Sequence, residues 1–224
     1  MNTRPTRILA ATCLVLTALL SIVSLLTQPE FTADPAQRLA QIDAAGTSAT
    51  VSALTFTLSQ LPFLIAVVAV AALAHARAPR AAWFGGVLGV LGGFGHSVFG
   101  GISLTYLALA ADATHRETMG HALTRVEAGP AKLFMAMGLL GTVLGLVVLG
   151  IALFRSRAVV RWVPVALWLF VVLEFALSNI ASWASLLSGL VYLAAFTGIA
   201  TQVLHEGWAM DSTEPVVPVP AVEA

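Results

Sequence analysis

The sequence predicts an all-α, polytopic membrane protein built as a six-transmembrane-helix bundle, and three observations lead to this prediction. Hydrophobic residues make up 58% of the 224-residue chain and charged residues only 10%, whereas about 25% of residues in a soluble domain are charged. Six apolar stretches are long enough to cross about 30 Å of hydrocarbon as helices. Nearly all lysines and arginines lie between these stretches rather than inside them.

The expected spans cover residues 8–26, 51–74, 82–110, 131–154, 162–179 and 182–205. The first follows Arg4 and Arg7, as a secretory signal would, but its apolar run is longer than a typical signal core, so we expect an uncleaved helix. A tight turn must separate the last two, because one helix over both would exceed any bilayer. Residues 1–205 are expected to form one domain, and the proline-rich segment 206–224 a disordered cytoplasmic tail.

Basic residues predict the orientation. One set would lie on one side of the membrane, in short connections: Arg4, Arg7, Arg77, Arg80, Arg155, Arg157 and Arg161. The smaller set, in longer loops, would lie on the other side: Arg38, Arg116, Arg125 and Lys132. The positive-inside rule then places both termini in the cytoplasm and the chain in the cell (plasma or inner) membrane.

Two loops on the outer side contain helix signals. Asp34-Pro35 provides an N-cap followed by proline at the first helical position, and Gly46 ends the segment. Thr114 and Glu117 fit a capping box, and that segment ends at Gly129. We expect two short extracytoplasmic interfacial helices, which are either simple connectors or a lid over the bundle.

Glu174 is the most informative residue, because it is an ionisable side chain inside an apolar span. A charge there costs about 2.5–3.5 kcal/mol on the insertion scale, so the carboxyl must be neutral, paired or hydrated. His96 is the expected partner. It follows Trp83 by nearly the same number of residues as Glu174 follows Trp162, which places both groups at a similar depth.

The third span also predicts which way His96 points. Its glycines share one side with His96 at helical spacing: Gly85, Gly89, Gly92, Gly93 and Gly100. Glycine stripes allow close helix packing, so this side should face protein. Gln60 and Asn179 fall in the same half of the membrane. We therefore predict a polar ligand pocket lined by Gln60, His96, Glu174 and Asn179, with a purely structural Glu–His contact as the alternative.

Other kinds of site receive less support. Glu117 and His121 share a helix face, but two ligands are too few for a metal site, and no second deep histidine is available for haem. The zero formal net charge gives no electrostatic reason to expect nucleic acid binding. We expect no metal and no cofactor.

Three functions remain open. The leading one is a non-enzymatic membrane protein that binds or moves a small or lipid-like ligand, with or without coupling to protonation. The second is an enzyme acting on a lipophilic substrate such as an isoprenoid, with Glu174 as the acid and His96 orienting it. The third is an accessory subunit whose glycine faces dock a membrane partner or a second copy.

Overall fold

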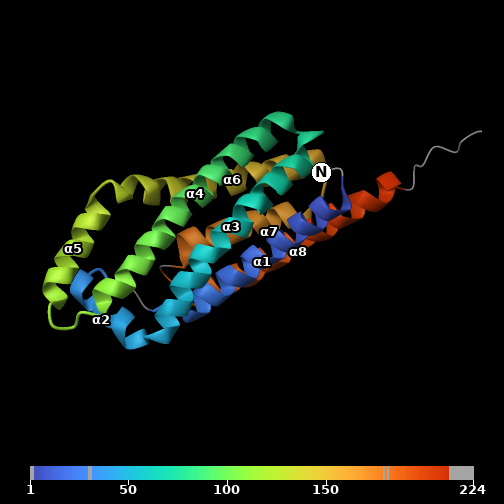
Figure 1. The fold of residues 1–224 in the computed structure, drawn as a ribbon. Helices are drawn as coiled ribbons and strands as arrows, with labels where there is room; N and C mark the ends of the chain where they lie inside the picture. Colours follow the sequence, from blue (N-terminus) through green and yellow to red (C-terminus); the bar gives the residue numbers. More distant parts are fainter. Residues whose placement is uncertain (1–2, 30–31, 179, 181, 212–224) are drawn as a thin grey trace, which may run out of the picture.

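The computed structural model describes residues 3–29, 32–178, 180 and 182–211, and within these ranges the secondary structure is entirely helical (Figure 1). Five helices are long and apolar enough to cross a membrane, which indicates a membrane-embedded protein. They are α1 (Arg4–Thr27), α3 (Thr47–His75), α4 (Pro79–Ala110), α6 (Ala131–Ser156) and α8 (Ser182–Asp211).

The fifth expected span is shorter than predicted. The chain forms α7 (Trp162–Val172) and then a π-helical turn, η1 (Leu173–Leu177). Together they cover about 24 Å at 1.5 Å per residue, less than the roughly 30 Å of a hydrocarbon core. The structure therefore supports five candidate spans and one shorter apolar helix, where composition alone predicted six spans.

The long helices form a ring. Following contacts around it, α1 packs on α3, α3 on α4, α4 on α6, α6 on α7, α7 on α8, and α8 returns to α1. Figure 1 shows these helices side by side, with the N-terminus and the C-terminal end of α8 at one end. The two connecting helices, α2 (Pro35–Ala45) and α5 (Arg116–Ala128), lie at the opposite end, called here the α2–α5 end.

Glycine governs the packing of α4. A Cβ atom added to Gly92 would lie 2.3 Å from the backbone nitrogen of Thr142, and one added to Gly95 would lie 2.3 Å from that of Gly138. Helices α4 and α6 therefore touch backbone to backbone, which only glycine permits. The other predicted packing glycines also face protein: Gly85 lies against α6, and Gly89, Gly93 and Gly100 against α3.

Helix α2 begins and ends where its cap residues predict. The Asp34 side chain accepts a hydrogen bond from Gln37 N at 2.8 Å. Gly46 has φ 52° and donates its N–H to the carbonyls of Ile42 and Asp43. Glycine adopts this positive φ without the steric cost that a side chain would add.

Helix α5 begins differently from the prediction. It starts at Arg116 after His115, and its N-cap makes no side-chain hydrogen bond, so the expected capping box from Thr114 to Glu117 does not form. Instead, Asp112 accepts the backbone N–H of His115 at 3.1 Å and lies 3.0 Å from its ring Nδ1. These hydrogen bonds lower the pKa of the Asp112 carboxyl below its ordinary value.

The C-terminal boundary also differs. Helix α8 continues to Asp211, beyond the predicted start of the tail at residue 206. The remainder of that predicted tail, 212–224, lies outside the described residues.

Candidate functional site: a cavity inside the helical ring

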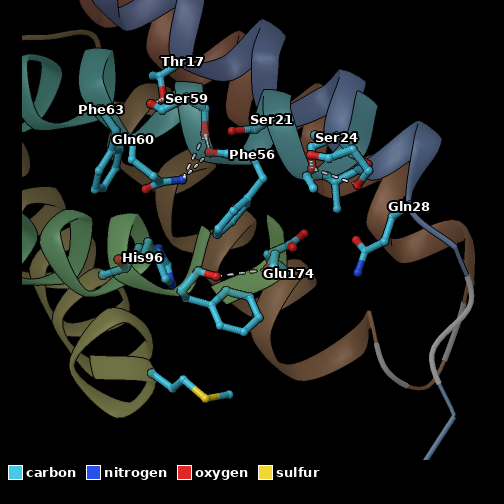
Figure 2. Close-up of a pocket in the computed structure, with 18 of the residues that line it drawn as sticks. Thr17, Ser21, Ser24, Gln28, Phe56, Ser59, Gln60, Phe63, His96 and Glu174 are labelled. Carbon is cyan, nitrogen blue, oxygen red and sulfur yellow. Dashed lines mark hydrogen bonds between the residues drawn. The ribbon is translucent and has the colours of Figure 1, made fainter. Parts of the chain in front are cut away.

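A cavity of about 480 Å³ lies inside the ring and extends to the α2–α5 end. Helices α1, α3, α4, α6, α7 and α8 and the turn η1 all contribute to its walls. Figure 2 shows side chains from several of these helices converging on it. Its size falls within the ordinary range of ligand pockets, about 300–1,000 Å³.

Helix α1 supplies a polar wall that sequence analysis missed. Thr17, Ser21, Ser24 and Gln28 all line the cavity (Figure 2). The spacing of three or four residues places Thr17, Ser21 and Ser24 on one face of α1, and Gln28 follows just after the helix ends. This periodicity was visible in the sequence. It was overlooked because hydroxyl groups are common in membrane helices and carry no charge to attract attention.

Two of these side chains bind α3. Thr17 Oγ1 donates to the carbonyl of Ser59 at 3.0 Å, and Ser24 Oγ donates to that of Ser52 at 3.0 Å. The Ser52 hydroxyl donates in return to the Ser24 carbonyl at 2.9 Å. These bonds fix α1 against α3 and leave polar surface along the cavity.

Gln60, predicted to line the pocket, does so from α3. Its Nε2 donates to the carbonyl of Phe56 at 3.0 Å and to Ser59 Oγ at 2.9 Å. The side chain is buried and held by its own helix, so its position is fixed before any ligand arrives.

His96 and Glu174 line the same cavity, as predicted from their similar depth, but they do not bond to each other (Figure 2). His96 Nδ1 lies 3.4 Å from Thr142 Oγ1, and its ring packs edge-on against Phe56 with centroids 5.7 Å apart. Glu174 Oε2 instead accepts a hydrogen bond from Ser188 Oγ of α8. The expected Glu–His partnership is therefore wrong, because each group finds a hydroxyl partner on a neighbouring helix.

The turn η1 determines where Glu174 points. A π-helical turn inserts one extra residue into a helix, which rotates the following side chains relative to a regular α-helix. The Ser178 hydroxyl donates to the Glu174 carbonyl within this turn. Such turns occur frequently at functional sites. Asn179, the fourth predicted pocket residue, lies outside the described residues.

Aromatic rings form much of the remaining wall. The cavity is lined by Phe56, Phe63, Phe99, Tyr106, Phe170, Phe175 and Tyr192. Phe170 stacks on Tyr192 with ring centroids 4.3 Å apart. Tyr192 lies one helical turn beyond Ser188 on α8, so the stacked pair is adjacent to the carboxyl of Glu174.

An ion-pair cluster borders the α2–α5 end of the cavity. Arg38 Nη1 of α2 lies 2.9 Å from Glu127 Oε1 of α5, and Tyr106 OH donates to the same oxygen at 3.0 Å. A second ion pair between α5 and α2 joins Arg116 to Asp43 at 2.9 Å. The sequence did not reveal this cluster, because its members come from three separated segments, and Arg38 and Glu127 resemble ordinary loop charges.

The charges on the pocket wall do not balance locally. Its acidic and basic residues in the described part of the chain are Arg38, His96, Glu127 and Glu174. Arg38 and Glu127 neutralise each other, and no lysine or arginine is paired with Glu174. The pocket thus presents one carboxyl group, one imidazole, several hydroxyls and many rings.

No protein-family model matches the chain, and no curated protein or solved structure is significantly similar to it. The arrangement of the pocket is therefore the basis for any functional assignment.

Proposed function

We propose that the protein is an integral membrane protein that binds or moves a small, lipid-like ligand in this cavity. The observation that supports the proposal is the cavity itself, because its wall combines apolar rings with a few fixed polar groups. That composition is typical of pockets for small molecules.

In this proposal the chain crosses the cell membrane six times, with both termini in the cytoplasm. Helix α7 with η1 makes the short crossing, which local thinning of the bilayer accommodates at modest cost. The α2–α5 end then faces outward, and α2 and α5 lie at the interface as a cover over the cavity. The fewer basic residues on that side agree with the positive-inside rule.

The two alternatives have less support. The enzyme hypothesis needs His96 to orient Glu174, and these groups have separate partners. The accessory-subunit hypothesis needs the glycines of α4 to dock a partner. Gly89 and Gly92 are instead covered by α3 and α6 of the same chain.

Adjacent leucines on α1 provide a matched test. Leu25 lines the cavity, whereas Leu26 is 64% exposed. We expect Leu25→Trp to fill the space and abolish ligand binding, and Leu26→Trp to leave it intact. The readout is the rise in melting temperature of the purified protein with farnesol, palmitate, triphenylphosphine oxide or tetraphenylphosphonium. A ligand at 100 times its Kd stabilises the folded state by about 2.7 kcal/mol.

The proposal fails if none of these probes stabilises the wild type. It also fails if Leu25→Trp and Leu26→Trp respond equally, since binding would then take place outside the cavity.

A further inference from the structure

The carboxyl of Glu174 has no cationic partner within the described protein. Its side-chain bond comes from Ser188, a neutral and fully buried hydroxyl. Among the described residues that line the pocket, Arg38 is the only arginine, and it is paired with Glu127 at the α2–α5 end. Glu174 is half-buried on the cavity wall, and a carboxylate without a counter-charge is strongly disfavoured inside a membrane. A ligand that carries a positive charge would supply what the wall lacks.

The surroundings of Glu174 favour a particular type of cation. Phe170 stacks on Tyr192 beside it, and Phe175 is its neighbour in the chain; all three line the cavity. These rings make the wall beside the carboxyl apolar, which favours a cation that carries its own apolar surface over a strongly hydrated inorganic ion. The apolar part of the ligand would pack against Phe56 and Phe99, which also line the cavity.

We propose that the ligand is a hydrophobic organic cation, such as a protonated amine or a quaternary onium compound, with its charge on the Glu174 carboxylate. This inference rests on the proposed function, because it requires the cavity to be a ligand site. It narrows the ligand from lipid-like molecules in general to cations of that chemical class.

The hydrogen bonds around Ser188 indicate the protonation state of Glu174 when no ligand is bound. Ser188 Oγ is within bonding distance of two acceptors, the carbonyl of Ser185 at 2.8 Å and Glu174 Oε2. A hydroxyl carries one proton and cannot donate to both. In the ligand-free state that we propose, Glu174 is protonated and the direction of its bond to Ser188 is reversed: the carboxylic acid donates to Ser188 Oγ, and Ser188 donates to the Ser185 carbonyl.

Binding is then an exchange of one cation for another. The O–H bond of the Glu174 carboxylic acid breaks, its proton leaves to water at the α2–α5 end, and the carboxylate becomes the counter-ion of the organic cation. Net charge in the cavity is unchanged. The other titratable groups on the wall are Arg38, His96, Tyr106, Glu127 and Tyr192. A protonated His96 would also repel a bound cation, so a Glu174 variant is needed to measure the contribution of Glu174 to binding.

Calorimetry on the full-length protein in detergent tests this inference. The probes are tetraphenylphosphonium and triphenylphosphine oxide, a neutral molecule with similar rings. We expect Glu174→Gln to weaken tetraphenylphosphonium binding by about tenfold or more, because the attraction between opposite charges is lost. Binding of the oxide should not change, which also shows that the variant is folded. Glu117→Gln, an exposed acid on α5, is the control and should behave as the wild type.

A second readout needs no variant. The wild-type protein is titrated with tetraphenylphosphonium in buffers of different ionisation enthalpy. If Glu174 is protonated before binding, about one proton should be released per cation bound. Two results would overturn the cation assignment but not the proposed binding pocket. One is an unchanged affinity of Glu174→Gln for tetraphenylphosphonium, and the other is tighter binding of the neutral oxide than of the cation by the wild type. If neither probe nor any lipid binds, the proposed function fails as well.

Discussion

Ser188 is the side chain on which the position of Glu174 depends. It is fully buried on α8, and it bonds to the Glu174 carboxyl on η1. Removing one partner of a buried hydrogen bond leaves the other unsatisfied and costs about 1–3 kcal/mol.

We therefore expect Ser188→Ala to lower the melting temperature by several degrees. Ser97→Ala is the matched control, because Ser97 Oγ donates only to the carbonyl of Gly93 in its own helix at 2.8 Å. That variant should change stability by about 0.5 kcal/mol or less. Equal losses in the two variants would show that the contact between Ser188 and Glu174 contributes nothing specific. The measurement is thermal unfolding of both purified proteins in one detergent at neutral pH.

At the scale of residues, the sequence predicted the position of a side chain along its helix better than the direction in which the side chain points. The rise of 1.5 Å per residue was enough to place His96 and Glu174 near one level, and both line the cavity. Their hydrogen-bond partners, Thr142 and Ser188, could not be predicted. Partners depend on the rotation of each helix about its axis, and the π-helical turn at Glu174 changes that rotation locally.

Among the elements, α4 and α6 show the closest packing. Glycine normally weakens a helix, so replacing it by alanine should stabilise an isolated helix by about 1 kcal/mol. At Gly92 the new Cβ would lie 2.3 Å from the backbone of Thr142, which cannot move aside as a flexible side chain could. At Gly101, by contrast, no atom lies within 4 Å of the new Cβ.

Alanine at these two positions should therefore have different effects on the stability of the protein. We expect Gly92→Ala to destabilise the protein by about 1–3 kcal/mol, the usual cost of overpacking. Gly101→Ala should leave stability unchanged or raise it slightly. Thermal unfolding and the fraction of monodisperse protein after purification measure both effects. Stabilisation by Gly92→Ala would mean that α4 and α6 do not approach as closely as the structure shows.

The elements themselves were largely predictable, with two informative exceptions. Long apolar stretches and the caps Asp34 and Gly46 located the major helices and α2, because both signals are local. The start of α5 was missed, since the chain there forms a turn in which Asp112 accepts the backbone N–H of His115, and the helix begins only at Arg116. The turn after the fifth stretch was predicted, but the shortness of α7 and the π-helical turn at Leu173–Leu177 were missed, because hydrophobicity alone does not show where a regular α-helix ends.

For the whole molecule, the sequence indicated three polar residues of the pocket, but the extent of the cavity could not have been derived from it. Its α2–α5 end brings together Arg38, Tyr106 and Glu127, whose proximity exists only once α2 and α5 pack over the bundle. Its polar wall on α1 faces inward only because the ring closes when α8 packs against α1. Local patterns specify faces of helices, whereas the enclosed space depends on how all faces are arranged.

The orientation of the chain decides whether the α2–α5 end faces outward, and cysteine labelling can determine both this orientation and whether the number of crossings is even. Cys13 is the only cysteine and is buried, so Cys13→Ala gives a background without thiols. Single cysteines would then replace three exposed residues: Thr3, Ala113 and His205. With six crossings and cytoplasmic termini, a membrane-impermeant maleimide should label Ala113→Cys in intact cells. Thr3→Cys and His205→Cys should react only after permeabilisation.

Each departure from this pattern has a separate meaning. Labelling of His205→Cys but not Thr3→Cys in intact cells would show an odd number of crossings, with Trp162–Leu177 failing to span the bilayer. Labelling of both Thr3→Cys and His205→Cys in intact cells, without labelling of Ala113→Cys, would show that the orientation is the reverse of the proposed one. The cavity would then extend toward the cytoplasm, and the proton displaced from Glu174 would be released there. The topology therefore determines from which side a cation could exchange with that proton.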